Sequence, residues 1–408
     1  MRYKITPPAK INTEIQLPSS KSISNRALIL NALSLNTNPI TNLSDCEDTE
    51  VIIDAFNSDS NVFDIKHAGT AMRFLTAFLS GMEGEWTIKG SSRMHERPIY
   101  PLVDTLRALG ADIEYIENEG YPPLKIKGKR LNGGEVHLAG SISSQFISAL
   151  LMIAPMMSKG LTIHLKNEVV SKPYIYLTIS LMKKYGVPVK WKNDTLTIKH
   201  KAYKPFSLTV ESDWSAASYW YEMVALLPDS QVKLLGLQKE SLQGDSKIAE
   251  LFEYLGVTTQ FLPDGVLISK TKAVNETFFY DFINEPDLVQ TFAVTCCFLG
   301  VRFLFSGMQT LKVKETDRVN ALIVELRKLG FVLQELKDNT LGWDGERCDA
   351  TENPVIETYN DHRMAMAFAP VAIARKSVLI NEPGVVVKSY PRFWEDLRNA
   401  GFFVEEIN

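Results

Sequence analysis

Five segments of the sequence share one ending, in which an amphipathic run with apolar residues at i, i+3 and i+4 closes with a glycine and a short apolar stretch. "LVDTLRALGADI" and "ALIVELRKLGFVL" are two of them. The closing glycines lie 70 to 76 residues apart and are Gly110, Gly186, Gly256, Gly330 and Gly401. This spacing predicts a repeated structural unit whose amphipathic helix ends at the glycine.

A second series of helices interleaves with the first. Each opens with small or polar residues and continues as an apolar run, as in "SSKSISNRALILNAL", and a helix that is apolar on all sides is buried. After a short first gap of 48 residues, the expected starts follow at gaps of 71 to 75 residues: Ser22, Thr70, Ser144, Ser215, Asp287 and His362. The sequence therefore predicts six copies of a unit with one buried helix, one amphipathic helix and short strands such as "GLTIHL", "DTLTIKH" and "GVLISK".

The repeat also predicts the fold class and where a site should form. Six such units do not easily share one core, so we expect an α/β protein of two domains with three units each. Each buried helix begins at a polar patch, so the helix N-termini should converge where the domains meet. Helix N-termini attract anions, which makes this region the expected binding site.

Composition excludes several classes of function. The 408 residues carry a net charge of −4, which gives no overall basic surface for nucleic acid. The four cysteines and six histidines show no metal-binding or redox spacing, so we expect no metal site. The N-terminus lacks the apolar core of a signal peptide, and no apolar stretch is long enough to span a membrane. We expect a cytoplasmic protein.

Cations and hydroxyls recur in the polar patches. These are "PSSKSISNR" with Lys21, Ser22 and Arg26, "AGTAMR" with Gly69, "HERP" with Arg97, "SSQ" with Ser143, Ser144 and Gln145, "SKPY" with Ser171 and Tyr174, "KVKETDR" with Lys314, Glu315 and Arg318, "NDHR" with Arg363, and "VVKSYPR" with Lys388. Taken singly, each has a simpler interpretation as a helix cap, a close helix contact or an i,i+3 pair. Together they favour a ligand with several anionic groups, since hydroxyls and arginine forks bind phosphate and carboxylate. No nucleotide-binding glycine motif is present.

Seven segments in order, "LPSSKSISNRAL", "AGTAMR", "ERPI", "SSQF", "SKPYI", "VKETDR" and "YNDHRMAM", resemble the signature segments of the 5-enolpyruvylshikimate-3-phosphate synthase family of enolpyruvyl transferases. The resemblance runs from near Pro18 to about Pro391. It implies two domains, each an inside-out α/β barrel of three βαβαββ units. The first domain would comprise residues 1–19 and 214–408 and the second residues 20–213, with the active site in the interdomain cleft.

The same resemblance implies an activity. The enzyme would move the enolpyruvyl group of phosphoenolpyruvate onto the 5-hydroxyl of shikimate 3-phosphate and release phosphate, on the route to chorismate and aromatic amino acids. The two substrates would be its only partners, with no metal, organic cofactor, nucleic acid or membrane, and we expect a monomer.

Site roles follow from the resemblance, residue by residue. The phosphate of shikimate 3-phosphate would be held by Ser143, Ser144 and Ser171, its carboxylate end by Ser22, Arg26 and Tyr174, and its hydroxyls by Lys314, with Lys21, Gln145 and Asp287 also in contact. The phosphate of phosphoenolpyruvate would be held by Lys21, Arg97 and Lys388, with Gln145 nearby, and its carboxylate by Arg318 and Arg363, beside Gly69. The catalytic groups would be Asp287 as base, and Glu315 with Lys21 for the proton at the enol carbon.

Some positions depart from the family pattern, and two alternatives stay open. His67, Phe74, Thr310 and the "ESDWS" segment differ from the usual residues but remove no charged catalytic group. One alternative is the related enolpyruvyl transferase that acts on UDP-N-acetylglucosamine, which would need a cysteine on a mobile loop; the only cysteine of that half is Cys46. The other is a non-catalytic anion-binding protein, which would need neither Asp287 nor Glu315.

Overall fold

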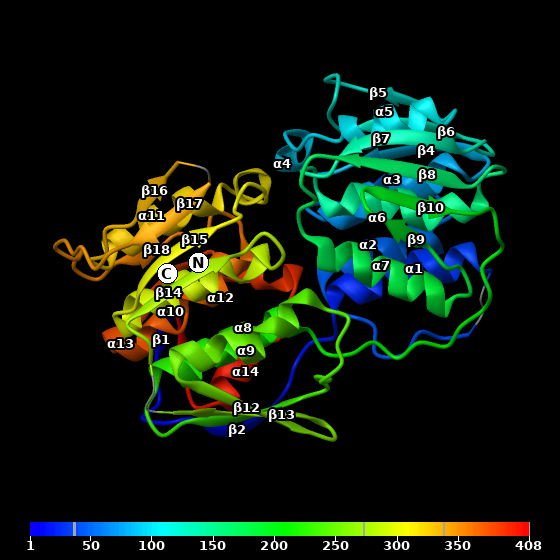
Figure 1. Cartoon of the computed structure of the whole chain (residues 1–408). Coiled ribbons are helices and arrows are strands. Elements are labelled where there is room, and N and C mark those ends of the chain that lie inside the picture. Colours follow the sequence, from blue (N-terminus) through cyan, green and yellow to red (C-terminus); the bar gives the residue numbers. More distant parts are fainter. Residues whose placement is uncertain (36–37, 272–273, 338, 408) are drawn as a thin grey trace. The chain divides into compact units, whose positions relative to one another are not determined.

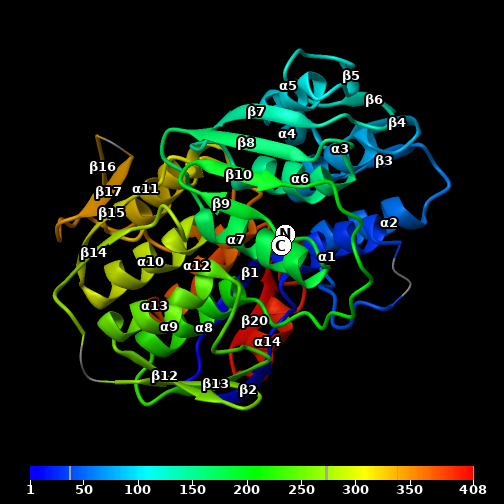
Figure 2. The ribbon, with the colours of Figure 1, turned by 45° about the vertical axis from the view of Figure 1, so that its right-hand side comes forward.

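The computed structural model describes residues 1–35, 38–271, 274–337 and 339–407. The chain divides into two compact units, shown in Figures 1 and 2. The first unit comprises Met1–Pro18 and Glu211–Asn408, and the second comprises Ser19–Val210. The boundaries expected from the sequence lie within three residues of these.

Among the described residues, five four-stranded sheets in the two units share one topology. In each, the first strand of the repeat is parallel to the second, and the remaining pairs are antiparallel, which is the βαβαββ pattern. The first unit holds β18 (Val355–Ile356), β19 (Val378–Asn381), β1 (Arg2–Thr6) and β20 (Phe403–Ile407); β12 (Val257–Leu262), β13 (Gly265–Lys270), β11 (Gln231–Leu235) and β2 (Asn12–Gln16); and β14 (Thr277–Asp281), β15 (Arg302–Ser306), β17 (Thr340–Trp343) and β16 (Gln334–Leu336). The second unit holds β7 (Gly134–Ala139), β8 (Leu161–Lys166), β10 (Thr195–Ile198) and β9 (Lys190–Lys192); and β3 (Val62–Asp64), β4 (Gly84–Lys89), β6 (Leu124–Gly128) and β5 (Asp112–Tyr115).

The helices occupy the positions between these strands. In the second unit they are α1 (Lys21–Leu33), α2 (Glu47–Asn57), α3 (Gly69–Ser80), α4 (Ser92–His95), α5 (Tyr100–Ala108), α6 (Ser144–Ile153) and α7 (Lys172–Lys184). In the first unit they are α8 (Trp214–Leu226), α9 (Ile248–Leu251), α10 (Val289–Leu299), α11 (Arg318–Lys328), α12 (His362–Phe368), α13 (Val371–Arg375) and α14 (Phe393–Asn399). Short 3-10 turns span Ala154–Met156, Gly244–Lys247, Phe252–Leu255, Pro286–Leu288, Leu311–Val313 and Pro383–Lys388.

The N-terminal segment completes two repeats of the first unit. β1 lies between β19 and β20, so the first strand of the chain closes the last repeat. β2 runs parallel to β11, and the whole second unit is inserted between β2 and α8. The first unit is therefore discontinuous in sequence.

The sixth copy of the repeat differs from the prediction. Among the described residues, only the isolated bridge between Thr41 and Thr209 stands where a four-stranded sheet was expected. The short first gap of 48 residues accommodates α1 and α2 but leaves too little chain for a full set of strands. The five described sheets also remain separate rather than closing into a continuous barrel.

The two helix series behave as the sequence predicts. α1, α3, α6, α8 and α12 each begin within one residue of the expected start, and Asp287 lies in the 3-10 turn that leads into α10. The five closing glycines all have a positive φ, which glycine adopts without a steric penalty. The segment before Gly256 is less regular than expected, with 3-10 turns on both sides of α9; such turns are common at helix ends.

Buried helices form the interior of each unit. In the first unit α8, α10 and α12 contact one another, and every side chain of α12 is buried. Figure 1 shows the sheets of this unit at its periphery, around those helices. In the second unit α1, α3 and α6 contact one another in the same way. No helix in the described part of the chain combines the length and apolar character needed to cross a membrane.

Glu222 is an exception to the apolar interior of the first unit. It lies on α8 with none of its side chain exposed, and neither carboxyl oxygen has a hydrogen-bond partner among the described residues. Burial raises the pKa of this carboxyl well above its usual value. The folded protein therefore binds this proton more tightly than the unfolded chain does.

We expect Glu222→Gln to stabilise the protein at pH 8 but not at pH 4.5. A raised folded pKa means that the contribution of Glu222 to stability is complete below the unfolded value of about 4.5 and declines as the pH rises toward the folded value. Glutamine does not ionise in this pH range, so the stability of the variant relative to wild type should increase with pH. Melting temperatures from pH 4.5 to 8 test this, with exposed Glu253→Gln as the control. A pH-independent difference would contradict it.

Candidate functional site

A single guanidinium binds three carboxylates at the start of α11. Arg318 is 1% exposed and donates from Nε to Asp361 Oδ2 (2.8 Å), from Nη1 to Asp287 Oδ1 (2.8 Å) and from Nη2 to Glu315 Oε2 (3.0 Å). Burial acts to lower the pKa of Arg318, but these carboxylates outweigh it and raise the pKa above its usual value. The i,i+3 pair that the sequence allows between Glu315 and Arg318 exists, and it is one part of a larger ionic cluster.

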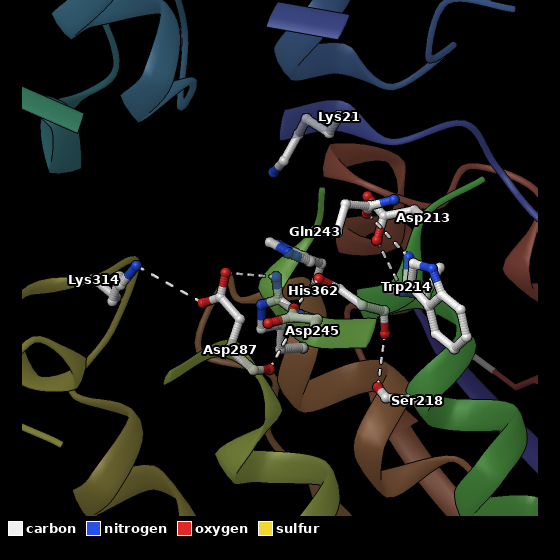
Figure 3. A network of polar contacts seen from close by, with 12 residues as sticks. Lys21, Asp213, Trp214, Ser218, Gln243, Asp245, Asp287, Lys314 and His362 are labelled. Atoms are coloured by element: carbon white, nitrogen blue, oxygen red, sulfur yellow. Dashed lines mark hydrogen bonds and ion pairs between the residues drawn. The ribbon is translucent and has the colours of Figure 1, made fainter. Parts of the chain in front are cut away.

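Asp287 is the centre of this cluster. Its Oδ2 lies 2.9 Å from Arg363 Nη2, and its Oδ1 lies 3.7 Å from Lys314 Nζ, the contact drawn in Figure 3. Burial acts to raise the pKa of Asp287, but Arg363, Lys314 and Arg318 together bring it well below the usual value. Asp287 is therefore ionised at neutral pH, as a group that accepts a proton must be.

Asp245 is a second buried carboxyl beside the first, and no motif in the sequence singled it out. Ser215 Oγ, in the first turn of α8, donates to Asp245 Oδ2. Burial, and then the negative charge of Asp287, raise the pKa of Asp245 to about 7. Figure 3 shows the two carboxyl groups near each other. The pair combines an ionised carboxylate with one that carries a proton near neutral pH.

Lys388 is held by the turn that precedes α12. Its Nζ donates to the backbone oxygen of Asn360 (2.7 Å) and to Asn360 Oδ1 (2.8 Å). The next residue, Asp361, is fully buried and caps α12 by accepting from the Arg363 backbone N–H (2.9 Å). Asn360 thus orients the side chain of Lys388, and Asp361 orients that of Arg318, although neither Asn360 nor Asp361 was itself assigned a role.

The second unit has an ion pair at the start of α1. Lys21 Nζ lies 3.0 Å from Asp48 Oδ2, on α2. Cys46, which precedes α2, is fully buried, and its Sγ lies 3.4 Å from Thr49 Oγ1. Burial raises the pKa of this thiol, which disfavours the thiolate that a reactive cysteine needs.

Two further guanidinium groups converge on the N-terminus of α3. A Cβ atom at Gly69 would lie 2.8 Å from Arg97 Nη1 and 2.9 Å from Arg73 Nη1. Arg73 Nη1 donates to the Gly69 backbone oxygen at 3.0 Å. Gly69 therefore leaves room for the protein's own arginines, which gather positive charge at a helix N-terminus.

Arg26 lies inside the second unit and connects three helices. It donates to Thr178 Oγ1 (2.7 Å), Ser148 Oγ (3.2 Å) and the backbone oxygens of Ser22 (2.9 Å) and Tyr174 (3.4 Å). Burial lowers its pKa to about 10, with an opposing contribution from Tyr174. Arg26 thus fixes the first turns of α1 and α7 relative to α6.

Four other predicted residues lie at the starts of α6 and α7. Ser143 Oγ accepts from the Gln145 backbone N–H (3.3 Å), and Ser144 is the first residue of α6. Gln145 Nε2 donates to Thr70 Oγ1 at 3.1 Å. Ser171 precedes α7 with a left-handed φ of 53°. Among the described residues, no three His, Cys, Asp or Glu side chains are grouped to hold a metal ion.

Comparisons with known proteins identify the family. The sequence model of EPSP synthase (3-phosphoshikimate 1-carboxyvinyltransferase) matches residues 5–58 and 53–397. The chain is 52% identical over 406 residues to 3-phosphoshikimate 1-carboxyvinyltransferase of Bacteroides fragilis, with 99% of both chains covered. It is 38% identical to the protein of that name from Aliivibrio fischeri, over 97% of this chain and 98% of the other.

Solved structures show the same fold. EPSP synthase from Acinetobacter baumannii superposes with a TM-score of 0.80 at 20% sequence identity, covering 99% of this chain and 100% of the other. The chain therefore has the two-domain enolpyruvyl transferase fold. On the family match and the full-length relatives, the chain belongs to the EPSP synthase family.

Proposed function

We propose that the chain transfers the enolpyruvyl group of phosphoenolpyruvate to the 5-hydroxyl of shikimate 3-phosphate and releases phosphate, as a transferase of the shikimate pathway. The observation that carries the proposal is the cluster in which Arg318, Arg363 and Lys314 surround the ionised carboxylate of Asp287. A base and the cations that would bind an anionic substrate are combined there, within a family whose relatives carry the corresponding name.

Phosphoenolpyruvate would bind through its two anionic groups. Arg318 and Arg363 would hold the carboxylate, because guanidinium groups pair with carboxylates through two parallel hydrogen bonds. The phosphate would be held by Lys388, Lys21 and Arg97, with Gln145 nearby and Gly69 beside the bound molecule. The gathering of Arg97 and Arg73 at α3 supports an anion site in the second unit.

Shikimate 3-phosphate would bind chiefly to helix starts of the second unit. Ser143, Ser144 and Ser171 would hold its phosphate with hydroxyls and backbone N–H groups. Ser22, Arg26 and Tyr174 would anchor the carboxylate end. Arg26 already donates to four protein acceptors, and two of these are the backbone oxygens of Ser22 and Tyr174. Part of its role would therefore be to orient these two residues. Lys314 and Asp287 would contact the hydroxyls, with Lys21 and Gln145 also near the ligand.

The reaction requires two proton transfers. Asp287 would take the proton of the 5-hydroxyl as its oxygen bonds to the central carbon of phosphoenolpyruvate, while Glu315 with Lys21 would deliver a proton to the methylene carbon. One proton of the resulting methyl group would then be removed as the carbon–oxygen bond to phosphate breaks, and Lys388, Lys21 and Arg97 would stabilise the departing phosphate.

The electrostatics of the cluster give a reason why Asp287 gains basicity at the right moment. In the structure, its pKa is low because Arg363, Lys314 and Arg318 all face it. A substrate carboxylate that pairs with Arg318 and Arg363 would share their positive charge. The pKa of Asp287 would then rise, so binding phosphoenolpyruvate would itself prepare the base.

Release of inorganic phosphate in a metal-free buffer tests the proposed function. Release should require phosphoenolpyruvate and shikimate 3-phosphate together. Release with UDP-N-acetylglucosamine in place of shikimate 3-phosphate would indicate the related transferase, which the buried position of Cys46 already disfavours. Tight binding of both substrates without release would indicate an anion-binding protein.

A further inference from the structure

Glu325 is a fully buried carboxylate on α11, seven residues and thus two turns beyond Arg318. Its Oε1 accepts from Tyr359 OH (2.6 Å) and Lys328 Nζ (2.9 Å). Its Oε2 accepts from Lys328 Nζ (2.8 Å) and the Glu357 backbone N–H (3.2 Å). One side chain thus connects the helix that carries Arg318 to the segment that leads into α12.

The segment bound by Glu325 has an unusual backbone. Tyr359 and Asn360 follow each other with φ values of 51° and 55°, in the left-handed region that residues with a Cβ rarely adopt. Such a backbone conformation is strained, and it persists only where the surrounding structure enforces it. Here Lys328 Nζ also bonds the Val355 backbone oxygen (3.0 Å), at the start of the segment.

This turn determines where two proposed phosphoenolpyruvate-binding cations lie. It directs both the backbone oxygen and Oδ1 of Asn360 toward Lys388 Nζ. It also places Asp361 so that one carboxylate oxygen caps α12 and the other bonds Arg318 Nε. Glu325 contacts neither cation, so its effect on them passes through Tyr359 and the backbone.

We propose that Glu325 is a positioning residue for enolpyruvyl transfer: by fixing the turn at Tyr359 and Asn360, it sets the positions of Lys388 and Arg318 toward phosphoenolpyruvate. Packing alone does not explain the buried Glu325 and the strained turn. Burying a carboxylate costs free energy, and so does a strained backbone. An apolar side chain would fill the position of Glu325 at least as well. The inference rests on the proposed function, because it assumes that Lys388 and Arg318 bind this substrate.

Tyr359→Phe is the sharper test, because it deletes one hydrogen bond to Glu325 and leaves no buried cation without its partner. We expect KM for phosphoenolpyruvate to rise about ten-fold, since small displacements of positioning groups weaken substrate contacts to this degree. KM for shikimate 3-phosphate, which binds chiefly to other residues, should stay within about two-fold. Glu325→Gln should change the same constant in the same direction, and by more.

Arg327→Gln, an exposed position on the same helix, is the matched control and should leave all constants unchanged. Assays belong well below each variant's melting temperature, so that only folded enzyme is compared. A lowered melting temperature with an unchanged KM for phosphoenolpyruvate in Tyr359→Phe would show a purely structural role and overturn the inference. An inactive wild-type protein would instead count against the proposed function.

Discussion

Asp287→Asn is expected to lower kcat by about 1000-fold, within the range that a general base contributes, while binding of shikimate 3-phosphate changes only a few-fold. Asparagine keeps the shape of the side chain but cannot accept the proton of the attacking hydroxyl. Because Asp287 also neutralises Arg318, Arg363 and Lys314, the variant should leave more positive charge for an anionic ligand. Affinity for phosphoenolpyruvate should therefore hold or increase.

Steady-state phosphate release and calorimetric binding measure the two effects separately. The exposed Asp349→Asn is a control for loss of one negative charge on the same unit and should behave as wild type. Unchanged turnover in Asp287→Asn would remove Asp287 from the proton transfer. An equal loss of turnover and of binding would assign it a binding role instead.

Arg318→Met should reduce the free energy of unfolding by about 3–5 kcal/mol, the range seen when one partner of a buried ionic network is removed. The methionine fills much of the space, but the carboxylates of Asp361, Asp287 and Glu315 lose a shared donor, and Asp361 is fully buried. The variant should also lose its affinity for phosphoenolpyruvate, since Arg318 would bind the substrate carboxylate.

Urea unfolding measures the stability change, and Arg327→Met tests the same substitution at an exposed position of the same helix. The control should fall within about 0.5 kcal/mol of wild type, as is usual for surface changes. A loss below about 1 kcal/mol in Arg318→Met would mean that the three carboxylates are stabilised by other groups. The ionic cluster would then not depend on this guanidinium.

The repeat is the part of the fold that the sequence determined well. Small or polar residues that open an apolar run are a local feature of the sequence, so the starts of α3, α6 and α12 could be predicted to within one residue. The sixth sheet could not be predicted, because a short gap between repeats does not reveal which strands are lost. Its place holds only a bridge between Thr41 and Thr209 in the described part of the chain.

The charged residues of the site stand out in the sequence, but their partners do not. Lys21 pairs with Asp48, 27 residues away, and Arg318 with Asp361, 43 residues away. Nothing in the local pattern distinguishes these aspartates from others near a helix start. Asp245 escaped notice for the same reason, since its raised pKa arises from burial and from Asp287 in a different repeat. Pairing across repeats requires the folded chain.

Analysis of the reaction product by proton NMR, with the reaction run in deuterated water, tests the central claim most directly. Transfer with protonation and deprotonation at the methylene carbon should convert shikimate 3-phosphate into an enol ether whose vinyl carbon carries deuterium, with one phosphate released per product. Phosphate accompanied by pyruvate and unchanged shikimate 3-phosphate would contradict the claim, because the chain would then hydrolyse phosphoenolpyruvate rather than transfer its enolpyruvyl group.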